Sequence, residues 1–296
     1  VEEPEQLKIW IHKVTVELTK IRVKEAVEKR DLLAVHAINT IDDIDKTTNL
    51  FMGRIREWYS LHFPELNKLV EQHETYARLI LNLGGRENFS TEKLVELGIS
   101  KTKAEKIVNA AETSMGASFK EEDFREIKAL CKTTLELYQR RRELEKYLEK
   151  TMDEVAPNIK ALVGALLGAR LIALAGSLEN LAKMPASTIQ VLGAEKALFR
   201  ALRTGSRPPK HGIIFQHTFL REAKKWQRGK IARALAGKLA IAARTDAYSG
   251  KYIGDTLKID LEKRINEIKE KYSEPPRRAY RPKKHFGKRR KKRGRS

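Results

Sequence analysis

The stretch AVHAINTIDDIDKTTNLFMGRIREW, Ala34 to Trp58, carries apolar residues at alternating spacings of three and four. That spacing is the heptad pattern of a coiled-coil seam, in which the repeated positions share one face of a helix. Ala37 and Thr48 are its weak links, because a small and a polar side chain bury little apolar surface. The seam residues are Ala34, Ala37, Ile41, Ile44, Thr48, Phe51, Ile55 and Trp58.

A second seam with the same alternation occurs later in the chain, after a gap of about 70 residues. Arg141 interrupts it, which indicates an exposed part of the seam. Two seams of similar length predict one antiparallel helical hairpin, and two ordinary amphipathic helices in a bundle remain the alternative. The residues of the second seam are Ile127, Leu130, Thr134, Leu137, Arg141, Leu144 and Leu148.

Residues 60–122 lie between the seams and are expected to cap the hairpin. Their predicted helices run from Pro64 to about Leu83, from Ser90 to Leu97 and from Ser100 to about Thr113. Serine begins the second and third of these, and two glycines end the first. An exposed tip built of apolar helices is a natural contact between two copies, which we expect around Leu79 to Leu83.

Beyond the second seam, Pro157 ends the long helix and marks a domain boundary. The predicted helices are Ala161 to Ala182, Lys224 to Ala243 and about Gly254 to Tyr272, with a weak strand signal only at Gly212 to Gln216. The fold class is therefore all-α. The predicted units are 1–33, a leading helix; 34–155, a coiled-coil dimerisation domain; 156–274, a compact helical domain; and 275–296, a disordered basic tail.

Positive charge is concentrated in two segments of this chain. The net charge is +21 over 296 residues. Residues 193–244 carry +11, and residues 275–296 carry +12 with no acid, which leaves the remainder at −2. A nearly neutral frame with two basic segments is typical of a polyanion binder.

The first basic segment overlaps VLGAEKALFRALRTGSRPPKHGIIFQH, Val191 to His217. Lysine and arginine neutralise phosphates at long reach, and a Gly/Pro loop lets backbone amides approach them. Rings could stack on splayed RNA bases, although core packing is the favoured interpretation for Phe199 and Phe215. A solvated helix face is the alternative for each arginine taken singly. The cations of the segment are Lys196, Arg200, Arg203, Arg207 and Lys210, and the candidate rings are Phe199, His211, Phe215 and His217.

No catalytic or cofactor motif is present. A glycine-rich loop followed by Lys-Ser/Thr is missing, and His211 and His217 have neither cysteine nor carboxylate near them, so we expect no enzyme, cofactor or metal. The single cysteine, Cys131, fits a reducing compartment and a buried position. The longest apolar run, Ala161 to Gly176, is short and contains Arg170. Without a signal peptide, the chain is expected to be soluble, intracellular and not membrane-bound.

Four motifs resemble the Nop-domain proteins, core components of box C/D small ribonucleoproteins. They are AINTIDDIDKTTN (Ala37 to Asn49), REWYSLHFPEL (Arg56 to Leu66), APNIKALVGALLGARLIALAGSLENLAKMPASTIQVLGAEKALFRAL (Ala156 to Leu202) and KIARALAGKLAIAARTDA (Lys230 to Ala247). The match extends over roughly Trp10 to Tyr272. The short chain and tail look archaeal, which implies a cytoplasmic protein, or a nucleolar one if the source is eukaryotic.

The resemblance implies a non-catalytic scaffold that homodimerises through its coiled coil. Its helical domain would bind a kink-turn of the box C/D guide RNA together with a small ribosomal-type protein already attached. The chain would support ribose 2′-O-methylation by fibrillarin. Residues matching the family's RNA segments are Gly193, Ala194, Glu195 and Lys196; Lys210, His211, Gly212, Gln216 and His217; and Arg228, Lys230 and Arg233, to which charge adds Arg200 and Arg203.

One departure from the family concerns fibrillarin. Family members usually carry an amino-terminal α/β domain that docks fibrillarin, and nothing of that kind precedes the leading helix here. Either the chain is a piece of a longer protein or it is unusual, and direct docking of fibrillarin is not expected from it. A general RNA- or DNA-binding protein that acts through its basic surface and tail is the second hypothesis.

Overall fold

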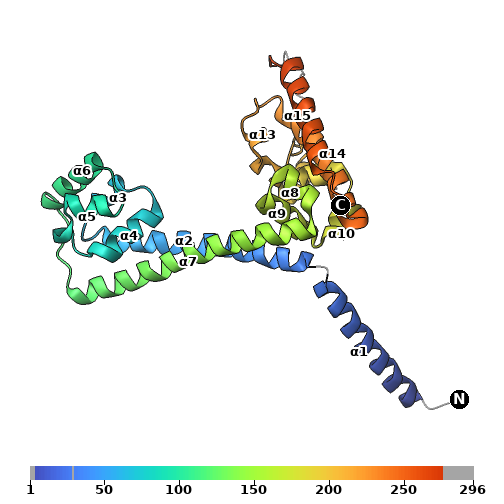
Figure 1. Ribbon diagram of the computed structural model, residues 1–296, viewed down its shortest axis with the longest axis horizontal. Helices are drawn as coiled ribbons and strands as arrows, with labels where there is room; N and C mark the ends of the chain where they lie inside the picture. Colours follow the sequence, from blue (N-terminus) through green and yellow to red (C-terminus); the bar gives the residue numbers. More distant parts are fainter. Residues whose placement is uncertain (1–3, 29, 276–296) are drawn as a thin grey trace, which may run out of the picture.

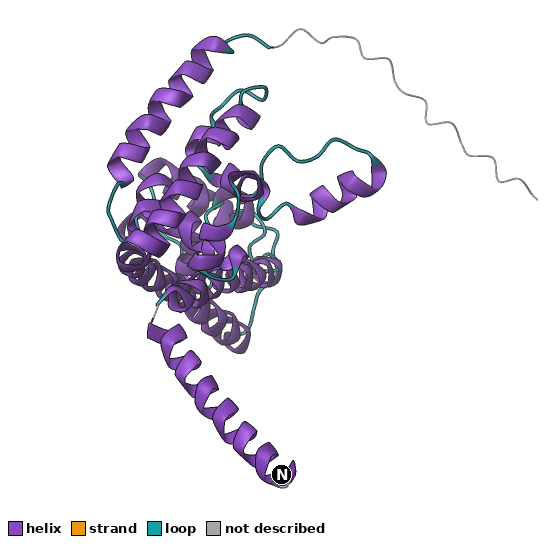
Figure 2. Ribbon diagram, turned by 90° about the vertical axis from the view of Figure 1, so that its right-hand side faces the viewer, coloured by secondary structure: helices purple, strands orange, loops and turns teal. Residues whose placement is uncertain are grey.

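The fold was analysed in a computed structural model, which describes residues 4–28 and 30–275. Within these ranges the chain forms helices joined by loops and no strand (Figure 2). The predicted all-α class is confirmed. The basic tail beyond Pro275 was predicted to be disordered, and it lies outside the described residues.

A long antiparallel hairpin organises the molecule. The chain runs out along α2 (Asp31–Tyr59) and returns beside it along α7 (Glu121–Val155), as the two seams predict (Figure 1). A helical tip lies at one end of the hairpin and a helical body at the other. Helix α1 (Pro4–Glu28) leads away from the base, and Arg30, between α1 and α2, has the left-handed backbone angle φ 48°.

The first seam follows its predicted positions as far as Thr48 and again at Ile55, which is fully buried. Beyond Thr48, Met52 and Tyr59 are fully buried, whereas Phe51 is half-buried and Trp58 is 39% exposed. A straight α-helix has 3.6 residues per turn, so a strict heptad drifts around it by about 20° per repeat. The prediction of Phe51 and Trp58 was wrong because the buried face moves on by one residue.

The second seam shows a similar shift, and Arg141 forms ion pairs within it. Cys131 is buried where Leu130 was expected, and burial raises the pKa of its thiol to about 12. Arg141 is not simply exposed: its Nε lies 2.5 Å from an oxygen of Asp45 on α2, and a terminal nitrogen lies 2.7 Å from Glu145. The arginine that interrupts the seam therefore joins the two helices.

The tip has its own hydrophobic core. Its elements are α3 (Leu66–Leu69), α4 (His73–Leu83), the 3-10 turn η1 (Arg86–Asn88), α5 (Thr91–Glu96) and α6 (Lys101–Glu112). One helix was expected from Pro64 to Leu83, but the chain breaks between α3 and α4. The guanidinium of Arg56 donates to the carbonyls of Val70 and Glu71, each at 2.8 Å, and so holds the break.

The contact between copies that was expected around Leu79 to Leu83 is wrong, because the apolar side chains of this stretch do not lie on the surface. Leu79 and Ile80 are fully buried in the tip core, and Leu83 is 6% exposed. These side chains hold α4 onto the hairpin, so a charge placed there would unfold the tip.

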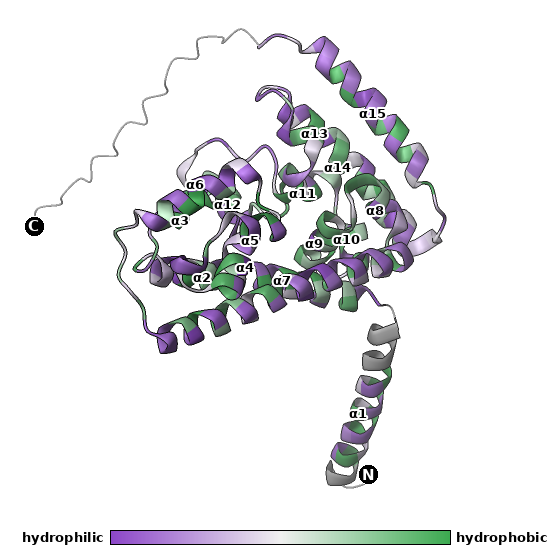
Figure 3. Cartoon of the chain, turned by 60° about the vertical axis from the view of Figure 1, so that its left-hand side comes forward, coloured by the Kyte–Doolittle hydropathy of each residue, from purple (hydrophilic) through white to green (hydrophobic). Residues whose placement is uncertain are grey.

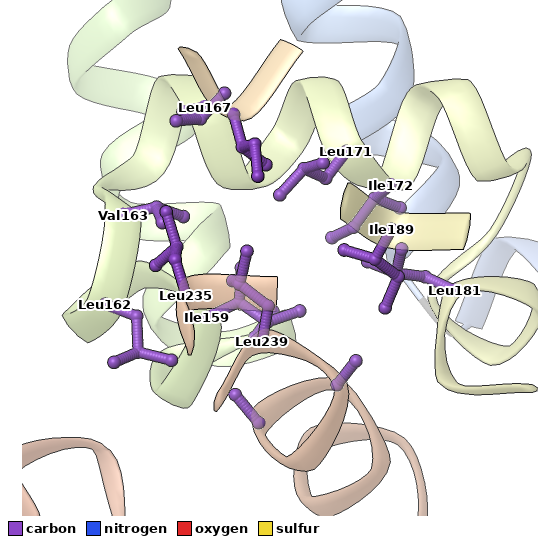
Figure 4. Close-up of a cluster of buried hydrophobic side chains, with 14 of the residues drawn as sticks. Ile159, Leu162, Val163, Leu167, Leu171, Ile172, Leu181, Ile189, Leu235 and Leu239 are labelled. Carbon is purple, nitrogen blue, oxygen red and sulfur yellow. The ribbon is translucent and has the colours of Figure 1, made fainter. Parts of the chain in front are cut away.

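The body is a layered cluster of short helices packed on the base of the hairpin. Its elements are α8 (Pro157–Val163), α9 (Ala165–Ala175), α10 (Leu178–Lys183), α11 (Ala186–Val191), α12 (Glu195–Thr204), the 3-10 turn η2 (Ile213–Gln216), α13 (Thr218–Arg221), α14 (Arg228–Arg244), the π-turn η3 (Thr245–Ser249) and α15 (Gly254–Lys271). Leu167, Leu171 and Leu235 lie in its core, with side chains from α8, α9 and α14 meeting (Figure 4).

The single helix expected from Ala161 to Ala182 is three helices. Gly164 and Gly176 have φ angles of 79° and 87°, which end α8 and α9. Gly168 has a packing role inside α9, because a Cβ there would lie 3.0 Å from Met152 of α7 and from Ile159 of α8. Helices α8 and α9 are hydrophobic over most of their length, whereas α15 alternates (Figure 3).

Two carboxylates of α2 join the hairpin to the body. Asp31 accepts a hydrogen bond from the backbone N–H of Leu178 at 3.1 Å, and Asp42 pairs with the guanidinium of Arg170.

No single helix in residues 4–28 and 30–275 is long and apolar enough to cross a membrane. Helices α8 and α9 reach that length only together, and they are bent by 119°.

Candidate nucleic-acid interface

Two segments of the predicted RNA site are hydrogen-bonded to each other. The N–H of Gly212 donates to the carbonyl of Gln190, and the N–H of Ile213 donates to that of Leu192, each at 2.8 Å. The side-chain amide of Gln190 donates to the carbonyl of Lys210 at 2.7 Å. The strand expected at Gly212 to Gln216 is wrong, because Ile213 begins the 3-10 turn η2.

Gly212 lies at the closest approach of these segments. A Cβ at this position would lie 2.0 Å from the Leu192 carbonyl oxygen and 2.6 Å from the carbonyl carbon of Val191. Real Cβ atoms do not come so close to backbone, so only glycine lets the two segments pair in this way. The family-like segments at 193 and 210 are therefore parts of one surface.

Glu195 shapes the loop that enters α12. Its carboxylate accepts a hydrogen bond from the N–H of Gly193 at 2.6 Å, and Gly193 has φ 82°. An acidic side chain in the first turn also suits the positive end of the helix dipole. Glu195, the one acid in residues 191–217, holds the backbone.

Helix α12 makes few contacts with the rest of the molecule and presents both charge and apolar surface. Lys196, Arg200 and Arg203 are exposed, as predicted for residues that could reach phosphates. The favoured core packing of Phe199 is wrong, because its side chain is 67% exposed, and Leu202 is 73% exposed. Ala201 of the same helix is buried, so within the described residues the uncovered part of the apolar face is the part that Phe199 and Leu202 form.

A basic cleft of about 450 Å³ opens between the loop that follows α12 and the start of α14. Its lining is Gln190, Arg207, Pro208, Pro209, Lys210, Trp226, Gly229, Lys230 and Arg233. No acid lines it. Across residues 4–28 and 30–275, the ion pairs do not include Arg207, Lys210, Lys230 or Arg233. Cations gathered without counter-charges suit a phosphate backbone.

Behind this cleft, His211, Phe215 and Arg228 pack together. The rings of His211 and Phe215 stack at 4.6 Å and 11°, and the Arg228 guanidinium lies 5.1 Å from the Phe215 ring. Burial lowers the pKa of His211, and the charges of Arg228 and Lys210 add to the effect. The favoured packing role of Phe215 is confirmed, and Arg228, which also donates to the carbonyl of Ala223, is a structural residue.

Gln216 and His217 lie in a different cleft, of about 1080 Å³, where the body meets the hairpin. Gln216 accepts a hydrogen bond from Arg170 at 3.0 Å. The Nδ1 of His217 accepts a hydrogen bond from the N–H of Phe219 at 3.3 Å, and burial lowers the pKa of the imidazole. The fourteen predicted site residues therefore divide among three places: α12 with the loop before it, the basic cleft with the residues packed next to it, and this junction.

Three further residues at the basic surface were missed by sequence reasoning: Trp226, Arg264 and Tyr272. Trp226 follows two lysines, a signal that could have found it. Arg264 belongs to α15 and Tyr272 directly follows it. The charges of α15 are balanced in sequence, and only its packing beside α14 brings these residues here. No group of three or more His, Cys, Asp or Glu side chains in the described part of the chain could hold a metal ion.

A helical hairpin that carries a body with an unpaired basic cleft defines a polyanion-binding scaffold. The chain belongs to the Nop family, whose model, described as "snoRNA binding domain, fibrillarin", matches residues 40–267. The resemblance inferred from the four motifs is confirmed.

Relatives of known name support the same family. A NOP5 family protein of Methanocaldococcus jannaschii is 52% identical over 265 residues, covering 90% of this chain and 64% of the relative. Nucleolar protein 58 of Homo sapiens is 40% identical over 272 residues, 91% of this chain and 51% of the relative. Nucleolar protein 56 of Homo sapiens is 42% identical over 254 residues, which cover 84% of this chain and 43% of the relative.

The chain thus spans between 43% and 64% of the length of these three relatives. Among solved structures, a chain from the "crystal structure of fibrillarin/Nop5p complex" is 26% identical with a TM-score of 0.49, and the match covers 90% of this chain and 81% of that chain.

Proposed function

We propose that this chain is a non-catalytic scaffold of a box C/D guide ribonucleoprotein. It binds a kink-turn RNA together with the small ribosomal-type protein that the RNA already carries. It pairs with a second copy through the hairpin, and it serves the ribose 2′-O-methylation that fibrillarin catalyses. In this proposal residues 34–155 are the dimerisation domain and residues 156–274 bind the RNA.

The observation that carries the proposal is the pairing of residues 190–192 with residues 210–213. It brings the loop before α12 and the basic cleft into one surface, so a ligand that contacts both must have a defined shape. The family's description as a snoRNA binding domain supports RNA as that ligand. The exposed Phe199 and Leu202 beside the cations fit a surface that contacts more than phosphates.

Binding of a box C/D RNA, measured with and without the small kink-turn protein, tests the composite surface. We expect the affinity to be at least about 10-fold higher with the protein in place, because contacts to both components then add. A guide RNA with a disrupted kink-turn serves as the control. Equal, weak binding in both cases would contradict the proposal.

The second hypothesis is a general nucleic-acid binder acting through charge alone. It predicts equal binding of RNA and DNA of the same length and a steep dependence on salt. It also predicts that most affinity is lost when residues 275–296 are removed, whereas composite recognition predicts that the preference for the kink-turn persists.

Self-association is proposed at the outer surface of the tip in place of the buried α4. Leu61 is 63% exposed, Met115 is 89% exposed and Trp58 is 39% exposed. The N–H of Ala117 donates to the carbonyl of Leu61 at 2.8 Å, which brings the loop of Met115 to the end of α2. Exposed apolar side chains gathered in this way favour burial against a like surface.

Replacing Leu61 and Met115 together by aspartate is expected to shift the protein from dimer to monomer in sedimentation. The substituted side chains are exposed, so the fold should persist, while the contact between copies would have to bury two charges. Leu174→Asp, on the 45% exposed α9 side chain in the body, is the matched control. An unchanged mass of the double variant would move the interface to another part of the molecule.

A further inference from the structure

We propose that the RNA path extends across α14 onto α15, where Arg264 makes a phosphate contact, an inference that rests on the function proposed above. A second cleft, of about 280 Å³, is lined by Lys230, Arg233, Ala234, Arg264, Ile268 and Tyr272. Helices α14 and α15 lie side by side along it.

The two clefts share Lys230 and Arg233. These two cations therefore stand between the clefts, accessible from both, and a strand that leaves the first cleft over them enters the second. Neither lining includes an acid, so the walls of the path from Arg207 to Arg264 offer cations to a phosphate backbone.

The counter-charge of Arg264 is easily exchanged. Among the residues that the structure describes, Arg264 forms its ion pair with Glu267, at 2.5 Å on the same helix, with the two side chains 63% and 61% exposed. Such exposed pairs contribute little to stability, so a phosphate can replace the carboxylate at small cost. Arginine also binds phosphate through two parallel N–H bonds, which favours the exchange.

The walls of the second cleft are held in place before any ligand binds. Trp226 Nε1 and Gln227 Nε2 both donate to the carbonyl of Tyr272 at 2.9 Å, which fixes the end of α15 to the start of α14. Lys230 Nζ lies 4.0 Å from the centre of the Tyr272 ring. A preformed site loses little conformational entropy on binding, which favours a specific contact over a loose charge effect.

The full chain, titrated with box C/D RNA bound to the small kink-turn protein at several salt concentrations, tests this path. Arg264→Gln is expected to lower the affinity roughly 3- to 10-fold and to reduce the slope of log affinity against log salt by about 0.7–0.9, the loss of one phosphate contact. Glu267→Gln is expected to raise the affinity about 2-fold, because it removes the competing carboxylate.

Arg54→Gln is the matched control, since Arg54 forms the same kind of pair with Glu57, at 2.7 Å with exposures of 67% and 68%, on the hairpin. It should change neither affinity nor slope. Wild-type behaviour of Arg264→Gln, alongside weakened binding by Lys230→Gln, would overturn the inference and leave the proposed function standing. Wild-type binding by Arg264→Gln and by Lys230→Gln would overturn the inference and the proposed function together. If Arg264→Gln loses binding to the small protein when no RNA is present, the second cleft binds a protein partner, and the inference is also overturned.

Discussion

Replacing Lys230 and Arg233 by glutamate is expected to lower the affinity for the RNA–protein complex by about 100-fold or more near 0.1 M salt. Both cations line both clefts, and no carboxylate in the cleft linings neutralises them. Each replacement removes one phosphate contact and places a negative charge on the path of the backbone. Fluorescence anisotropy with labelled guide RNA measures the affinity. The slope of log affinity against log salt should decrease by the amount expected for the loss of about two phosphate contacts.

The control for this double variant has the same change in net charge at another place. Lys146 and Lys150 are exposed on α7, away from both clefts, and their replacement by glutamate should change the affinity by less than about 3-fold. Similar losses in the two double variants would support binding by total charge and contradict a defined path. A denaturation curve guards against unfolding, because Lys230 also contacts the Tyr272 ring.

The hairpin could be predicted from sequence because its cause is local. Apolar residues at helical spacing specify which face of α2 and α7 is buried, and what was missed is the drift that buries Met52, Tyr59 and Cys131. The breaks of the helix expected at 161–182 depend on Gly164 and Gly176, and the same residue type packs inside α9 at Gly168. A glycine in a run of small residues does not reveal which role it has.

The site was harder to predict, because its geometry comes from contacts between distant segments. Charge marked Lys210, Lys230 and Arg233, and the structure places them in one cleft. The charge pattern could not show that Arg228 packs on Phe215, or that Gln216 and His217 face the hairpin. Whether a cation of a basic segment is free or engaged depends on its neighbours in space.

Replacing Gly212 by alanine is expected to abolish shape-specific recognition while leaving the cations in place. The new Cβ would lie 2.0 Å from the Leu192 carbonyl oxygen, so the hydrogen bonds to Gln190 and Leu192 must break or shift. Overpacking of this kind costs about 1–3 kcal/mol of stability, so the body should stay folded. The loop before α12 then separates from the cleft, and the affinity for the RNA–protein complex should fall about 10- to 100-fold.

The distinguishing readout of Gly212→Ala is the preference for the complex over RNA alone. Weak binding of RNA by charge should persist, because Lys210, Lys230 and Arg233 remain, while the gain from the small protein should disappear. Gly237→Ala on α14 is the control, since its Cβ would meet no atom within 4 Å. If Gly212→Ala keeps the preference for the complex, the pairing of residues 190–192 with residues 210–213 does not form the recognition surface, and the contacts must come from α12 alone.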